Sequence, residues 1–144
     1  MAAALLDGSL VVLLGVVTAS DLRTRLVPDT PLVAGLLLAV GMYALGSPGQ
    51  LPGRLGAGAG AAGFLLAAAL IRPEGMGLGD VKLAGVLGVY LGVAVIAAMV
   101  VAFAVGSVVG VVLIARHGWA TRTRTIAFAP CLALGGAVAM ALQL

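Results

Sequence analysis

The stretch VKLAGVLGVYLGVAVIAAMVVAFAVGSVVGVVLIA, from Val81 to Ala115, decides the fold, because it is apolar apart from Lys82 over 35 residues. At about 1.5 Å rise per residue, one helix of this length is too long for an untilted crossing of a bilayer core about 30 Å thick. Two helical crossings with a tight turn near Leu91 to Val93 fit better. The stretch therefore predicts a helical membrane protein.

The rest of the chain has the same character, since 62% of the 144 residues are hydrophobic and only 9% are charged, far from the balance of a soluble domain. The 22 glycines lie inside apolar runs, where small residues let membrane helices approach closely. Pairs with GxxxG spacing occur often by chance in such sequence. This chain has three such pairs: Gly56 with Gly60, Gly88 with Gly92, and Gly106 with Gly110.

Four further apolar runs are each close to the roughly 20 residues that a spanning helix needs. The second of these runs begins at Pro31. We expect Thr30 or Asp29 to cap the helix that this run forms, with the proline in its first turn. The expected fold is all-α, a single domain over residues 1–144 with six transmembrane helices. The four runs are Leu5 to Leu22, Pro31 to Gly46, Arg54 to Ile71, and Ile126 to about Gln143.

The basic residues orient this chain in the bilayer. The loops after spans one, three and five, with their edges, hold seven of the eight, and Arg54 alone lies on the other side. The positive-inside rule makes the basic side cytoplasmic and puts both termini outside. The seven form no continuous stripe, so we expect no nucleic-acid partner. They are Arg23, Arg25, Arg72, Lys82, Arg116, Arg122 and Arg124.

Metal and disulfide chemistry have little support. The single cysteine, Cys131, excludes an intrachain disulfide and a multi-cysteine metal site, and the single histidine, His117, argues against a histidine-ligated zinc. We expect neither a metal nor a cofactor.

Two of the five acidic residues stand apart. We interpret Asp7 as an interfacial residue, Asp29 as a helix cap and Glu74 as a solvated loop residue. Asp21 ends the first span and Asp80 begins the fourth, so the topology brings both to the same depth near the cytoplasmic face. Carboxylates are costly at the edge of a bilayer core and need a reason to be there.

A pair of neighbouring carboxyl groups can perform acid and base catalysis. Two such groups cannot both ionise easily, so at neutral pH one holds a proton while the other accepts one. An aspartic protease uses this arrangement to activate water and to polarise a peptide carbonyl. The alternative, from position alone, is that the two aspartates only cap helices or pair with Arg23 and Lys82.

Asp80 follows a glycine-rich run, GMGLG, from Gly75 to Gly79. Glycine allows backbone conformations closed to other residues, and it leaves peptide groups open to pair with an extended substrate. We therefore expect the loop from Arg72 to Asp80 to move during the reaction. The alternative is an ordinary flexible loop between helices.

Three segments together resemble a known family. GMGLGDVKL, from Gly75 to Leu83, resembles the GxGD signature of the prepilin peptidases, and DLRTRLVPD, from Asp21 to Asp29, resembles their pattern of aspartate, basic residues, an aliphatic residue and proline. IAFAPCLALG, from Ile126 to Gly135, resembles the proline-containing motif of their last span.

The resemblance implies a protease of the bacterial inner membrane that cleaves leaders of type IV prepilins or pseudopilins after a glycine, at the cytoplasmic edge of the substrate's apolar helix. It implies that Asp21 and Asp80 are the catalytic pair. Lys82 would be an electrostatic or substrate-binding neighbour, or equally an inner-face anchor. The other implied substrate-binding or loop-shaping residues are Gly75, Gly77, Gly79 and Pro130.

The resemblance is to the short, peptidase-only form of the family, without the N-terminal region that carries paired cysteines and N-methyltransferase activity. Two alternatives stay open. One is another GxGD intramembrane protease, of the presenilin or signal-peptide-peptidase kind. The other is a non-catalytic transport or assembly component whose aspartates bind ions or pair with arginines. The glycine pairs also leave open a homo-oligomer.

Overall fold

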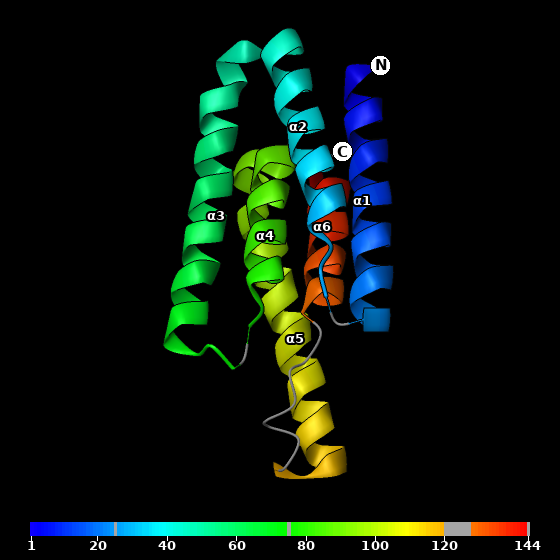
Figure 1. Cartoon of the computed structure of the whole chain (residues 1–144), viewed down its shortest axis with the longest axis vertical. Coiled ribbons are helices and arrows are strands. Elements are labelled where there is room, and N and C mark those ends of the chain that lie inside the picture. Colours follow the sequence, from blue (N-terminus) through cyan, green and yellow to red (C-terminus); the bar gives the residue numbers. More distant parts are fainter. Residues whose placement is uncertain (25, 75, 120–127, 144) are drawn as a thin grey trace.

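The computed structural model describes residues 1–24, 26–74, 76–119 and 128–143, and these residues form helices joined by short links (Figure 1). Every regular element among them is helical, so the all-α prediction is confirmed. The elements are α1 (Ala2–Thr24), α2 (Asp29–Gly46), η1 (Pro48–Gln50), α3 (Leu51–Ile71), α4 (Leu78–Leu91), η2 (Gly92–Ala94), α5 (Val95–His117) and α6 (Ala129–Gln143).

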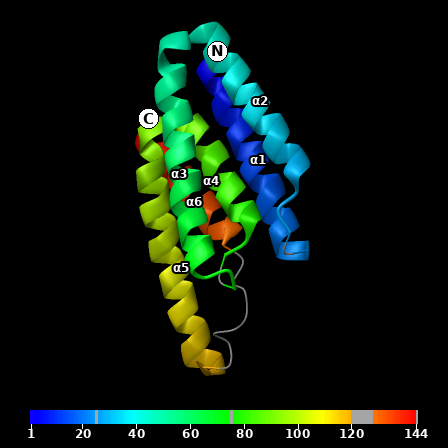
Figure 2. The ribbon, with the colours of Figure 1, turned by 60° about the vertical axis from the view of Figure 1, so that its left-hand side comes forward.

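The long apolar stretch folds as predicted, with a turn in its middle. The short helix η2 separates α4 from α5, and its first residue, Gly92, has a φ of 60°. This left-handed conformation favours glycine, because a Cβ would collide with the backbone. Figure 2 shows α5 running back alongside α4 after the turn.

Four stretches are long and apolar enough to cross a membrane: Ala2–Thr24, Asp29–Gly46, Pro48–Ile71, and Leu78–His117, which contains α4, η2 and α5. Helix α6 is apolar but has only 15 residues. The expected start of the last span at Ile126 lies outside the described residues. The chain is thus an apolar helical bundle of membrane character.

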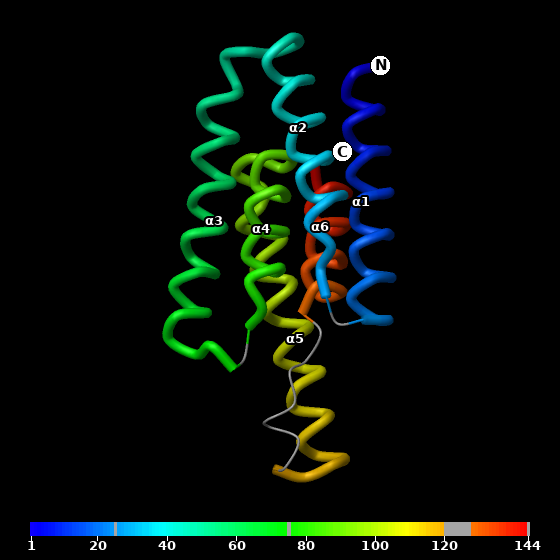
Figure 3. The backbone as a smooth tube through the Cα atoms, in the orientation of Figure 1, coloured from blue at the N-terminus to red at the C-terminus, as the bar shows by residue number. Residues whose placement is uncertain are grey.

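Helix α4 is the centre of the bundle. Ten of its 14 residues are buried, whereas the other helices each bury one side. Helices α2, α3, α5 and α6 all pack against it. The tube in Figure 3 shows how the chain surrounds it: α1, α2 and α6 lie on one side and α3 on the other. The position of a residue at either end of α4 is therefore determined by packing against several other helices.

Glycines let two pairs of helices pack backbone to backbone. A Cβ added to Gly58 of α3 would lie 2.7 Å from the carbonyl oxygen of Gly85 in α4, and one added to Gly135 of α6 would lie 2.9 Å from the carbonyl carbon of Ala98 in α5. Real Cβ atoms do not approach so closely, so these positions require glycine. The close contacts fix how α3 and α5 sit against their neighbours.

The GxxxG pairs serve separate purposes within the chain. Gly88 packs against Gly58, while Gly92 makes the turn. Gly106 faces the ring of Phe128, and the positions of Gly56 and Gly60 open onto free space. Whether the last two pack against another molecule stays a prediction.

Candidate active site

Two aspartates are the buried charged residues of the described chain. Asp21 lies in the last turns of α1 and is 5% exposed, and Asp80 lies in the first turn of α4 and is 8% exposed. Aspartate is almost never buried unless it is paired or functional. Their burial in a bundle made of leucine, valine and alanine therefore requires an explanation.

The register of α1 turns Asp21 inward. The buried residues of this helix recur every three or four positions, which is the spacing of one helix face, and Asp21 continues that series. The Asp21 carboxylate thus occupies an inward position of the kind that leucine and valine fill elsewhere on this face. The inward residues of α1 are Leu6, Leu10, Leu13, Leu14, Val17 and Asp21.

The structure brings the two aspartates together, although 58 residues separate them in the sequence. The Asp21 carboxylate is close enough to the Asp80 carboxylate to interact with it electrostatically. A second negative charge is disfavoured beside the first, so the ionisation of one carboxyl group opposes the ionisation of the other.

The link between α1 and α2 holds this arrangement. The hydroxyl of Ser20 donates a hydrogen bond to the carbonyl oxygen of Leu26 at 3.2 Å, which folds the link back on α1. The next residue, Val27, then sits directly on Gly79, where an added Cβ would lie 2.6 Å from the Val27 Cβ. The residue before Asp80 must therefore be glycine for the link to reach α4.

An ion pair joins the start of α2, directly after this link, to α4. The Lys82 Nζ lies 2.8 Å from the Asp29 Oδ1, and both side chains are more than half exposed. The expectation that Asp29 or Thr30 caps α2 is wrong: Pro28 occupies the N-cap position, no side chain caps it, and the Asp29 carboxylate binds Lys82 instead. The geometry thus gives Lys82 a partner on α2.

The end of the glycine-rich run belongs to α4, so the loop before this helix is shorter than expected. Helix α4 starts at Leu78, so Gly79 and Asp80 are helical, and the N–H of Asp80 donates to the carbonyl oxygen of Gly77 at 3.2 Å. The Asp80 carboxylate in turn interacts with the backbone N–H of Gly77, which is the N-cap residue. This contact orients the carboxylate at the start of the helix.

Neither Gly77 nor Gly79 uses the backbone freedom of glycine in this structure. Gly77 has an ordinary extended conformation, with φ −78° and ψ 149°, and positive φ among the described glycines occurs at Gly92 and Gly118. Gly79 is needed for close packing and not for an unusual backbone angle. Gly75 lies outside the described residues.

Helix α6 brings its proline motif to the same place. Pro130 lies in the first turn of α6, where proline costs no hydrogen bond. The next residue, Cys131, is 5% exposed and its thiol interacts electrostatically with Asp80. Three helices thus meet at the aspartates: α1 and α4 with a carboxyl group each, and α6 with a thiol.

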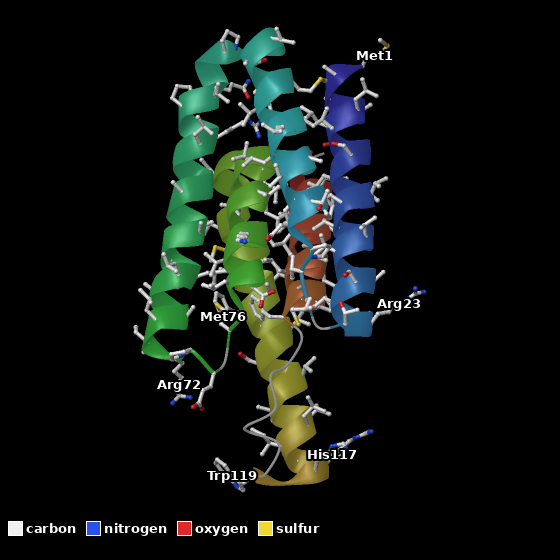
Figure 4. All side chains as sticks on the ribbon, in the orientation of Figure 1. Met1, Arg23, Arg72, Met76, His117 and Trp119 are labelled. Atoms are coloured by element: carbon white, nitrogen blue, oxygen red, sulfur yellow. The ribbon has the colours of Figure 1, made fainter. Side chains whose placement is uncertain are left out.

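Basic side chains surround this end of the bundle. Arg23 and Arg72, labelled in Figure 4, point away from the lower end of the helices, while Met76 lies closer to the core. Lys82 and Arg116 also belong to this side, and Arg54 lies near the opposite end. Arg25, Arg122 and Arg124 lie outside the described residues.

The arrangement can perform acid and base chemistry without a further group. One carboxylate can accept a proton from water while a protonated carboxyl donates one. In the described residues, no group of three or more histidine, cysteine, aspartate or glutamate side chains gathers where it could hold a metal ion.

Three neighbours of the aspartates were not predicted as contacts. They are Ser20, Val27 and Cys131. Ser20 directly precedes Asp21 in α1, so the sequence alone could have indicated that it lies near the aspartate. The contacts of Val27 and Cys131 join distant segments, so spacing could not reveal them.

Comparison with known proteins identifies one family. A family model described as the type IV leader peptidase family matches residues 9–115, which include both aspartates and extend over most of the chain. Comparison with curated proteins and with solved structures finds no match.

Proposed function

The chain belongs to the type IV leader peptidase family, and we propose that it is an aspartic endopeptidase that removes leader peptides from type IV prepilins or pseudopilins. The family itself indicates a membrane peptidase. The observation that carries the finer proposal is the meeting of two buried carboxyl groups, from α1 and α4, in a bundle that is otherwise apolar.

The proposed reaction uses the two carboxyl groups in opposite protonation states. The ionised group takes a proton from a water molecule, and the water oxygen forms a bond to the carbonyl carbon of the leader. The protonated group donates a hydrogen bond to the carbonyl oxygen, where negative charge develops. When the carbon–nitrogen bond breaks, a proton passes to the leaving nitrogen.

We place the reaction at the cytoplasmic boundary of a bacterial inner membrane in which all six long helices lie. Four of the five basic residues in the described chain belong to the aspartate side, and basic residues favour the cytoplasm. The N-terminus and the end of α6 lie toward the other end, which would be outside (Figure 1). A leader rich in positive charge would remain in the cytoplasm during cleavage.

The test is cleavage of a co-expressed prepilin, seen as a gel shift, with Asp21→Asn and Asp80→Asn made separately. Asparagine keeps the shape of the side chain but can neither accept nor supply the proton, so each change should abolish the shift. Glu74→Gln is the matched control, because Glu74 is an exposed carboxylate on the same side of the bundle as the aspartates. Thermal unfolding in detergent checks that each variant is folded.

Unchanged cleavage in either folded aspartate variant would defeat the proposal. The cleaved bond distinguishes the remaining protease alternative. N-terminal sequencing of the product should place it at the edge of the substrate's apolar helix, after a glycine. A bond within the helix would instead indicate intramembrane proteolysis of the presenilin kind.

A further inference from the structure

The end of α4 opposite to Asp80 lies inside the bundle. With 14 residues the helix is about 21 Å long, which is less than the roughly 30 Å of a bilayer core. Figure 1 and Figure 2 show that the turn after α4 lies well below the connection between α2 and α3. The last four carbonyl groups of a helix have no partner within it, and in apolar surroundings they must find one elsewhere.

Arg54 supplies partners for two of these carbonyl groups. Its Nη1 donates to the carbonyl oxygens of Val89, at 3.5 Å, and of Tyr90. The side chain is itself held in place, because Nε and Nη2 both donate to the Gln50 Oε1 at 3.3 Å, and the guanidinium carbon lies 4.1 Å from the centre of the Tyr43 ring. The arginine is thus a fixed cap and not a freely moving surface charge.

The other carbonyl groups of this turn are also satisfied, by the backbone and by side chains from α2 and α6. Together with Arg54, these bonds account for each of the last four carbonyl groups of α4. They run from the Gly92 N–H to the Gly88 oxygen, from the Tyr43 hydroxyl to the Tyr90 oxygen at 3.2 Å, and from the Gln143 Nε2 to the Leu91 oxygen at 2.8 Å.

A cavity with a partly polar wall accompanies the cap. It has a volume of about 410 Å³, and Arg54, Tyr43 and Gln143 share its wall with Asp7 and Gln50. Irregular backbone at membrane depth is tolerated where it is buried in protein or lines such a cavity. Charged residues within membrane helices are expensive and usually have a function.

We propose that Arg54 is a positioning residue for the Asp21–Asp80 pair, an inference that rests on the proposed function. Ten residues of continuous helix, about 15 Å, join Tyr90 to Asp80. A helix transmits a shift along its axis from one end to the other. The cap therefore fixes the depth of Asp80, while Val27 and Gly79 hold that end of α4 against the link from α1.

The decisive comparison is Arg54→Met against Arg54→Lys. Methionine fills similar space but donates no hydrogen bond, so the end of α4 loses its cap, whereas lysine can still donate to a carbonyl group. Since a displacement near 1 Å can cost about 100-fold in rate, kcat for prepilin cleavage should fall roughly tenfold to 100-fold in Arg54→Met, with KM nearly unchanged. Arg54→Lys should recover part of the loss.

Two further variants complete the kinetic test. Tyr43→Phe removes one bond to the same turn and keeps the packing, so it should lower kcat less but in the same direction, even if Arg54→Met does not fold. Arg116→Met is the matched control, because Arg116 is exposed in the last turn of α5. All rates are measured per amount of folded enzyme.

A second readout does not depend on cleavage. Spin labels on Leu22→Cys and Leu78→Cys, in a Cys131→Ala background, report the separation of α1 and α4 beside the aspartates, because both leucines are exposed. Arg54→Met should shift or broaden this distance by at least the rise of one residue, about 1.5 Å, and Arg54→Lys should change it less.

An unchanged label distance in Arg54→Met, or a normal kcat with less folded protein, would overturn the positioning role. Failure of the proposed function would look different. In that case Asp21→Asn and Asp80→Asn would still cleave the prepilin, whatever the labels report about α4.

Discussion

Gly77 and Gly79 precede the same aspartate, yet a side chain would meet different surroundings at each. A Cβ on Gly77 would lie 3.8 Å from the Asp80 Oδ2, which is ordinary contact. On Gly79 it would lie 2.6 Å from the Val27 Cβ. Of the two, Gly79 is the position where packing against the link from α1 demands glycine.

We therefore expect Gly79→Ala to destabilise the protein by about 1–3 kcal/mol, the usual cost of forcing a methyl group into a packed site. Cleavage should fall with it, because α4 is pushed away from Asp21. Val27→Gly in the same chain should recover part of both losses, since it removes the Cβ and the Cγ2 that an alanine at position 79 would meet at 2.6 and 2.9 Å. Thermal unfolding in detergent and the prepilin gel shift measure the two effects, and a double variant no better than Gly79→Ala would contradict this account.

At the scale of elements, the Lys82–Asp29 pair decides between two roles for the lysine. Both side chains are exposed, so the pair should add less than about 1 kcal/mol to stability. If Lys82 acts by tying α4 to α2, then Asp29→Ala should change cleavage as much as Lys82→Ala, and the double variant no further. If Lys82 binds the substrate, Lys82→Ala alone should raise KM. Steady-state kinetics on the three variants separates these outcomes.

The contact between α3 and α4 gives another prediction for elements. Gly88 lies against the backbone of Gly58, so Gly88→Val should force the helices apart and lower the unfolding temperature in detergent. Gly60→Val is the matched control on α3, because its side chain would enter open space. Equal unfolding temperatures for the two variants would show that the close contact between α3 and α4 contributes little to stability.

At the scale of the whole molecule, the proposed orientation can be tested by labelling cysteines in a Cys131→Ala background. Gly49, between α2 and α3, and Glu74, between α3 and α4, lie at opposite ends of the bundle and are both exposed. A maleimide that cannot cross membranes should label Gly49→Cys in intact cells, and Glu74→Cys only after permeabilisation. The reverse pattern would put the aspartates outside.

The sequence by itself determined the membrane character, the helices and the turn near Leu91 to Val93. These follow from local properties: the length of apolar runs, and the few places where glycine, proline or charge interrupts them. It also singled out Asp21 and Asp80, because a carboxylate at the edge of an apolar run is unusual wherever the run packs.

Only the tertiary structure decided which residues touch. That α4 is the central helix, that Val27 sits on Gly79, that Lys82 pairs with Asp29 and that Arg54 caps α4 all depend on packing between segments far apart in the chain. Apolar helices satisfy their own backbone wherever they lie, so their sequences restrict their neighbours only weakly. Close contacts between glycines and a few polar bonds make that choice, and they exist only once the helices have met.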